Sequence, residues 1–359
     1  MFATLLDANR IDDAKAMQPE LKTVLSLPYE HDLTVRYLML ATRLLFKEHD
    51  FANKGDNFDA AEKNVKTVEP LLSQASNETL ILYYTNKAHL FTAKGDIKSA
   101  LKCYHNSIEL FGDKMPYARI YQQMSHCYIL LHKYHHAIRY IQHARASYEG
   151  DMTNPMSYVN NELLASCYAN TGEYKKAEEL FEMSYNQSKL SGNEIAQGLS
   201  LYNMAEMAMN MGNYDTALEK LDMALQLIEK NMSDVILYNK HVYIFTIYSK
   251  AVILAKLNRE NKEIIELGRP LAEGNETFTI ILDTAYHLGK INSADSENYL
   301  EKVTIPHLLS CGGHEMCLLL AVCKELEAHY KKKKSKTKAA YMAAIIRDIY
   351  EDMFMGDVE

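Results

Sequence analysis

Two stretches near the middle of the chain, LLASCYANTGEYKKAEELF (163–181) and YNMAEMAMNMGNYDTALEKL (202–221), carry the same spacing of small and aromatic residues. The matching positions, each repeated after 40 residues, are Ala165 and Ala205, Gly172 and Gly212, Tyr174 and Tyr214, and Ala177 and Ala217. One period earlier Ser125 and Ala137 keep the register, although His132 replaces the glycine. A period of this length made of paired helical segments is typical of a helical solenoid.

The same spacing extends toward both ends of the chain. Ala88, Gly95 and Ala100 mark a helix pair that begins near residue 79. Small residues let two helices approach closely, and a glycine permits the tight turn between them. Toward the C-terminus the pattern weakens. The pair at 238–271 keeps Asn258 at its turn but lacks the alanine that marks the helix contact in the other pairs. We therefore predict an all-α fold, a right-handed superhelix of tetratricopeptide (TPR) repeats.

We predict two regions along the chain. Residues 1–75 form an N-terminal helical region of degenerate first repeats. Within it, 33–46 is an apolar helix buried on several sides, and a later helix ends near Pro70. Residues 76–359 form the TPR solenoid with C-terminal capping helices, because terminal repeats have a neighbour on one side only and are expected to be atypical.

Composition and charge exclude several classes of protein. The formal net charge of -8 argues against a nucleic-acid surface over the whole chain. The first residues lack a basic segment followed by an apolar run, so we expect no secretory signal. No stretch approaches the ~18 uninterrupted apolar residues that a membrane span needs. The 6 cysteines lie in or beside predicted helices, and we expect reduced thiols in a cytoplasmic protein.

The first helix of each TPR unit lines the concave face, so its inward positions are candidate ligand contacts. These positions are largely polar on helices that are otherwise apolar. An asparagine offers one acceptor and two donors, which suits the repeating backbone of an extended peptide. A solvated stripe in an empty groove would look the same; we favour the peptide groove. The candidate peptide-binding residues are Asn203, Asn170, Asn210, Glu206, Tyr202, Glu162, Ser166, Gln123, His126, Arg119 and Asn86.

Other reactive residues give weaker signals. His132 and His136 have i, i+4 spacing, but His132 lies at a turn and no carboxylate or cysteine completes a metal site. Cys311, Cys317 and Cys323 are spaced by six, which scatters them around a helix. The lysine run 331–334 is either a phosphate patch or a set of solvated turn lysines, and we favour the second. Nucleotide-binding and hydrolase motifs are absent, so we expect no cofactor, no metal and no enzymatic activity.

Two stretches, IAQGLSLYNMAEMAMNMGNYDTALEKLDMALQL (195–227) and ELEAHYKKKKSKTKAAYMAAIIRDI (325–349), together with the TPR period, resemble a family of cytoplasmic quorum-sensing receptors. That family joins the Rap proteins with NprR, PlcR and PrgX, which bind re-imported oligopeptides in Gram-positive bacteria. The sharpest match is LxNxA, here Leu201, Asn203 and Ala205. The resemblance implies that Asn203 bonds the backbone of a signalling peptide.

The resemblance implies that peptide binding switches transcription regulation, response-regulator binding in the sporulation phosphorelay, or both. We expect a homodimer or higher homo-oligomer. Rap phosphatases use a Gln on the second helix of an N-terminal bundle, whereas 36–46 has none and places Leu44 or Leu45 there. The chain is most like NprR without its helix-turn-helix domain, so we expect DNA contact only through such a domain, which this sequence does not contain.

Two alternatives stay open. One is a Rap-type protein that binds or dephosphorylates a response regulator. The other is a general TPR scaffold that binds an acidic chain terminus, which needs a clamp of lysine and arginine in the groove. Only Arg119 among the inward positions would serve such a clamp.

Overall fold

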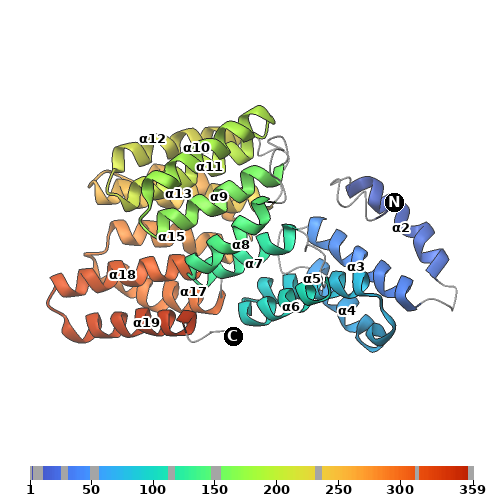
Figure 1. Ribbon diagram of the computed structural model, residues 1–359. Coiled ribbons are helices and arrows are strands. Elements are labelled where there is room, and N and C mark those ends of the chain that lie inside the picture. Colours follow the sequence, from blue (N-terminus) through green and yellow to red (C-terminus); the bar gives the residue numbers. More distant parts are fainter. Residues whose placement is uncertain are drawn as a thin grey trace. The chain divides into compact units, whose positions relative to one another are not determined.

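The computed structural model describes residues 2, 11–25, 31–48, 56–111, 118–146, 155–230, 237–311 and 315–354. Every regular element in these ranges is a helix (Figure 1). None of these helices is long and apolar enough to cross a membrane. The chain divides into two compact units, Met1–Cys127 (unit 1) and Tyr128–Asp357 (unit 2).

Unit 1 is built from short antiparallel helices. They are α2 (Ile11–Leu25), α3 (His31–Glu48), α4 (Asp56–Val68), α5 (Asn77–Ala93), α6 (Ile97–Glu109) and most of α7 (Ala118–Leu130). The apolar helix expected at 33–46 is α3, and its Val35 and Met39 pack with Tyr83 of α5 in one core. Helix α4 gives way at Glu69–Gln74 to a 3₁₀ turn that contains Pro70, as expected for a residue without a backbone N–H.

The division between the units differs from the expected boundary at residue 75. Helix α5, the first helix of the recognisable repeats, is joined to α3 through the buried core and through a hydrogen bond. Asn86 Nδ2 donates to the backbone oxygen of Met39 at 2.6 Å. The first recognisable repeat is therefore part of the N-terminal unit.

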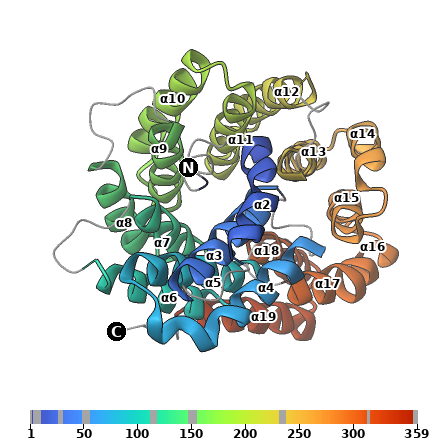
Figure 2. The ribbon, with the colours of Figure 1, turned by 90° about the vertical axis from the view of Figure 1, so that its right-hand side faces the viewer.

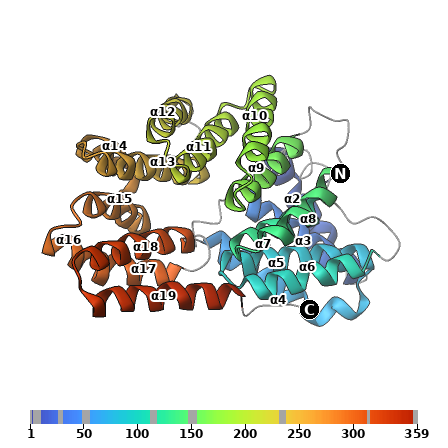
Figure 3. The same ribbon diagram turned by 60° about the vertical axis from the view of Figure 1, so that its left-hand side comes forward.

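Unit 2 contains most of the repeats. Its helices are α8 (Tyr134–Ala146), α9 (Pro155–Asn170), α10 (Tyr174–Leu190), α11 (Glu194–Asn210), α12 (Tyr214–Lys230), α13 (Leu237–Lys256), α14 (Lys262–Ala272), α15 (Glu276–Gly289), α16 (Ala294–Tyr299), α17 (Ile305–Cys311), α18 (Met316–Lys332) and α19 (Lys336–Phe354). A π-helical turn, Leu300–Thr304, connects α16 to α17. Consecutive helix pairs stack side by side, as α9–α10, α11–α12 and α13–α14 do in Figures 2 and 3.

Most of the turns inside the helix pairs repeat one backbone conformation. Six of these turns have a residue with positive φ at the same place, Gly95, His132, Gly172, Gly212, Asn258 and Lys334, whereas the turn after α15 at Gly289 has none. Seven residues before most of these turns lies a small residue at most 1% exposed: Ala88, Ser125, Ala165, Ala205 and Ala251. Ala251 corrects the expectation that the α13–α14 pair lacks an alanine at its helix contact. The turn at Asn258 was expected, but the seven-residue spacing was not extended back from it to Ala251.

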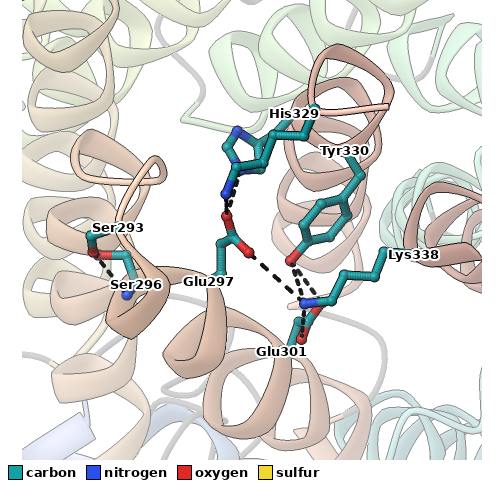
Figure 4. A network of polar contacts seen from close by, with 8 residues as sticks. Ser293, Ser296, Glu297, Glu301, His329, Tyr330 and Lys338 are labelled. Atoms are coloured by element: carbon teal, nitrogen blue, oxygen red, sulfur yellow. Dashed lines mark hydrogen bonds and ion pairs between the residues drawn. The ribbon is translucent and has the colours of Figure 1, made fainter. Parts of the chain in front are cut away.

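Lysines 331–334 lie at the end of α18 and at the turn into α19, and Lys333 and the nearby Lys338 of α19 contact acidic side chains; the contacts of Lys338 are drawn in Figure 4. Glu297 accepts hydrogen bonds from His329 Nε2 at 2.9 Å and from Lys333. Glu301 accepts from Lys338 at 3.0 Å and from the Tyr330 hydroxyl at 2.7 Å. These lysines therefore tie the last helix pair to the preceding repeat, which is a structural role that neither sequence interpretation included.

The left-handed turn gives a first prediction. A Cβ on Gly172, where φ is +82°, would meet nothing within 4 Å, so Gly172→Ala strains only the backbone. We expect a loss of about 1 kcal/mol in the free energy of unfolding, measured with urea. The matched control is Asn258→Gly at φ 54°, which should change stability by less than about 0.5 kcal/mol. Equal effects of the two variants would contradict this explanation.

The C-terminal network gives a second prediction. The Glu297 side chain is 12% exposed, and although burial raises the pKa of its carboxyl, hydrogen bonds from Lys333 and His329 outweigh it and lower that pKa. When the pKa of a carboxyl is lower in the folded protein than in the unfolded chain, the ionised carboxyl stabilises the fold at pH values above the unfolded pKa. This stabilisation is lost as the pH falls through the folded pKa. Glu297→Gln should therefore lower the free energy of unfolding by about 2 kcal/mol at neutral pH.

That difference should shrink as the pH is lowered below about 4, because Glu297 is then protonated in the parent as well. Urea unfolding at several pH values measures it. Glu351→Gln, which removes an exposed ion pair with Arg347, is the control and should have little effect at any pH. A Glu297→Gln effect that is independent of pH would contradict the ionic explanation.

Candidate functional site

A buried carboxylate links two neighbouring first helices of unit 2. Glu162 of α9 is only 7% exposed. Asn203 of α11 donates its Nδ2 to Glu162 Oε2 at 2.8 Å, and Ser200 of the same helix donates to Oε1. Burial raises the pKa of Glu162, and the hydrogen bonds from Ser184, Ser200 and Asn203 oppose that rise. The structure thus joins two of the predicted site residues directly.

A second carboxylate also accepts a hydrogen bond from the next first helix, although it lies four residues later in the register than Glu162. Glu206 of α11 accepts a hydrogen bond from Ser249 Oγ of α13 at 2.6 Å. Burial raises the pKa of Glu206. Tyr202 lies one turn earlier on α11, and burial together with the nearby Glu206 carboxylate raises the pKa of its hydroxyl. Both acids therefore lie in a protein-enclosed environment with part of their charge satisfied by a neighbouring helix.

Ser249 is a residue that the sequence analysis missed. It precedes the turn residue Asn258 by nine positions, just as Asn203 precedes Gly212 by nine. The two side chains therefore occupy the same place in successive repeats, and each donates to an acid on the preceding first helix. The spacing that identifies Ser249 is present in the sequence. It was not applied to the α13–α14 pair because Ala251 was not recognised as the small residue at the helix contact.

Helix α18 approaches the same region from the C-terminal side of unit 2. Cys317, near its start, lies with Sγ 3.7 Å from His132 Nε2 at the turn before α8. Cys317 is exposed to solvent, yet burial and the Glu206 carboxylate raise the pKa of its thiol. Further along, Lys256 of α13 pairs with Glu325 of α18 at 2.6 Å.

The remaining predicted residues of unit 2 lie on the same first helices. Ser166 is half-buried on α9, and its backbone oxygen accepts a hydrogen bond from Asn170 Nδ2 at 2.8 Å. Asn170 and Asn210 are exposed and end α9 and α11. Together with Glu162, Tyr202, Asn203 and Glu206, they form a set of polar side chains on two adjacent helices.

Four of the predicted residues, Asn86, Arg119, Gln123 and His126, belong to unit 1. Asn86 is 2% exposed, and its amide is used by the Met39 carbonyl, so it does not line an open face as expected. Arg119, Gln123 and His126 are half-buried on α7. Burial and the positive charges of Arg119 and Arg43 lower the pKa of His89 to about 3. This part of unit 1 is cationic, unlike the acidic helices of unit 2.

The histidines and cysteines considered as metal ligands have other contacts. His132 Nδ1 lies 2.7 Å from the Tyr134 hydroxyl, and His136 stacks on Tyr128. In the part of the chain that the structure describes, no three His, Cys, Asp or Glu side chains are grouped as a metal site. All 6 cysteines are free thiols.

Comparison with known proteins places this geometry in a known architecture. A tetratricopeptide repeat family matches residues 200–236. No curated protein matches the sequence. The apo form of the quorum sensor NprR from B. thuringiensis is similar in structure, with 20% identity, a TM-score of 0.73, and coverage of 97% of this chain and 96% of that chain.

Two further solved structures contain peptides. NprR in complex with its cognate peptide NprX has 18% identity and a TM-score of 0.70, with 96% of each chain covered. A Rap protein complexed with Competence and Sporulation Factor has 12% identity and a TM-score of 0.81, covering 98% of this chain and 96% of that chain. The chain therefore has the TPR superhelix fold that NprR and the Rap proteins share, as its sequence resemblance indicated.

Proposed function

We propose that this chain is a receptor for a short signalling oligopeptide, bound in an extended form along α9, α11 and α13 of unit 2. The observation that carries the proposal is the pair of inter-repeat links, Asn203 to Glu162 and Ser249 to Glu206. Their donors, Asn203 and Ser249, occupy the same position of successive repeats; Asn203 and Glu206 are half-buried, whereas Ser249 and Glu162 are buried. The fold is that of NprR, solved with its cognate peptide NprX, and of a Rap protein solved with Competence and Sporulation Factor.

The arrangement suits recognition of a peptide backbone. Successive residues of an extended peptide present N–H and C=O groups at a regular spacing, and a stack of repeats presents side chains at a regular spacing too. Asn203, Tyr202 and Glu206 follow one another within about one turn of α11. Asn170 and Asn210, exposed at the ends of two adjacent helices, extend the set of donors and acceptors.

We further propose that peptide occupancy controls a second binding event, to a response regulator or to a transcription target. The chain would act by binding, not by dephosphorylation. The position expected to hold a phosphatase glutamine is Leu44 or Leu45, and Leu44 is 1% exposed in a cluster with Leu40 and Ala14. A side chain enclosed in this way has no access to a phosphoryl group. Self-association of the chain stays a prediction.

Calorimetry with a substituted receptor tests the proposal. A degenerate library of free hexapeptides, captured on the purified full chain and identified by mass spectrometry, supplies the peptide. We expect Asn203→Ala to weaken its binding about 3- to 10-fold, because one side chain to backbone hydrogen bond is lost. Asn186→Ala, an exposed asparagine on the outer helix α10, is the matched control and should not change affinity. Failure to capture any peptide, or unchanged affinity in Asn203→Ala, would contradict the proposed peptide-binding function.

Charge on the inner helices gives a further expectation about the peptide. Helices α9 and α11 carry Glu162 and Glu206 but no lysine, arginine or histidine. Glu206 has a single hydrogen bond from Ser249 within the described residues, so part of its charge is available to a cationic ligand. We therefore expect the site to prefer a peptide with a lysine or arginine.

Two hexapeptide libraries, one with a fixed lysine and one with a fixed glutamate, measure this preference. Capture should favour the lysine library several-fold at about 0.05 M salt, and the preference should decrease at about 0.5 M because salt screens the attraction. Glu206→Gln should reduce the preference. Equal capture of both libraries by the parent protein would contradict an acidic site.

A further inference from the structure

We propose that Glu162 is a positioning residue that fixes the carboxamide of Asn203 with its oxygen toward the binding face, so that the site accepts a backbone N–H of the peptide there. This inference rests on the proposed peptide-binding function. It assigns a direction to one hydrogen bond of the site, which we call the polarity of the site. Asn203 acts as an acceptor toward the ligand, although an asparagine can in general both donate and accept.

The contacts of Glu162 carry the argument. An ionised carboxylate only accepts hydrogen bonds, so the group that Asn203 turns toward it is the NH₂ group. The distance from Nδ2 to Oε2 is 2.8 Å, within the range of a charge-assisted hydrogen bond. The other carboxylate oxygen accepts from Ser200, whose hydroxyl also lies 3.4 Å from the Ser184 hydroxyl of α10. Both oxygens of Glu162 are therefore engaged, and its own orientation is fixed by two helices.

The consequence for Asn203 follows from the shape of a carboxamide. Its oxygen and nitrogen point away from each other, so a nitrogen held by Glu162 leaves Oδ1 on the opposite side. Asn203 is half-exposed, and no described residue donates to its Oδ1. The oxygen is therefore available to a ligand, while one N–H of the amide is used inside the protein.

The neighbouring repeat shows why this polarity is particular to Asn203. Ser249, at the equivalent position, donates its hydroxyl proton to Glu206. A hydroxyl rotates freely about its C–O bond, so a serine has no fixed donor and acceptor side, and Ser249 is moreover only 3% exposed. A planar carboxamide cannot exchange its ends without a half turn about its last bond. Glu162 opposes that turn, because it would bring Oδ1 against a carboxylate oxygen.

A double-mutant cycle tests whether Glu162 acts through Asn203. The probe is the hexapeptide captured from the degenerate library, and calorimetry measures its affinity for the parent, Glu162→Met, Asn203→Ala and the double variant. We expect Glu162→Met to weaken binding about 3- to 10-fold. In the Asn203→Ala background the same substitution should have no further effect. Losses that multiply in the double variant would show that Glu162 contributes through general packing and would overturn the inference.

Folding of the variants needs its own control, because Glu162→Met leaves buried hydroxyls with fewer partners. Urea unfolding identifies a variant that does not fold. Glu162→Gln then replaces it, since a glutamine of the same size can face Asn203 with either its oxygen or its nitrogen and no longer fixes the amide. It should weaken binding in the same direction by a smaller factor, and again only when Asn203 is present.

An ester scan of the peptide tests the polarity itself. Each backbone N–H is replaced in turn by an ester oxygen, which removes a donor and leaves the side chains unchanged. One position should lose about 3- to 10-fold in affinity for the parent and lose nothing for Asn203→Ala. A scan in which no ester weakens binding, or in which the loss is equal in Asn203→Ala, would overturn the inference while leaving peptide binding intact. If no peptide is captured at all, the proposed function fails and this inference fails with it.

Discussion

The close contact of two helices at a small residue, followed seven positions later by a left-handed turn, is the constraint on which the rest of the structure depends. Ala165 and Ala205 are at most 1% exposed, and the turns that follow them pass through Gly172 and Gly212. Packing in protein interiors is dense, so a larger side chain at these places would separate the helices. The distance from this contact to the turn is the same in five of the described helix pairs, so equivalent positions recur at the same spacing before these turns.

The inter-repeat links depend on that regularity. Asn203 reaches Glu162 and Ser249 reaches Glu206 across adjacent first helices, from the same register position but to acids that lie four residues apart in the register. Placing a carboxylate in such an enclosed position is unfavourable unless hydrogen bonds compensate. Glu162 receives two, from Asn203 and Ser200. The polar residues of the inner helices are therefore partly structural and partly available to a ligand, and one residue can serve both purposes.

The two units differ in the charge of their candidate faces. In unit 1, Arg43, Arg119 and His126 act together on the buried His89. In unit 2, the inner helices α9 and α11 carry carboxylates and no basic residue. The same repeat architecture thus provides two chemically different surfaces. The net charge of the chain, -8, describes neither of them.

Periodicity allowed much of the fold to be predicted, and the limits of that prediction have physical causes. The positions of Ala88, Ala165 and Ala205 identified helix pairs because these contacts lie within one repeat. Asn86 occupied a polar inward position in the same register, yet it is buried against α3, an irregular helix outside the recognisable period. Ser249 was missed although its repeat keeps the register, because the spacing back from the expected turn at Asn258 was not applied to this helix pair.

The sequence by itself determined the helix pairs, their turns and the choice of Asn203, because each depends on spacings of 40 residues or fewer within a regular pattern. Only the tertiary structure decided which polar side chains face each other. The bond from Asn203 to Glu162 joins residues 41 positions apart on different repeats, and the contact of His132 with Cys317 joins residues 185 apart. Such contacts depend on the rotation accumulated over successive repeats, which no local spacing specifies. What the sequence marked as a polar stripe became, in the folded chain, a set of donors and acceptors with defined directions.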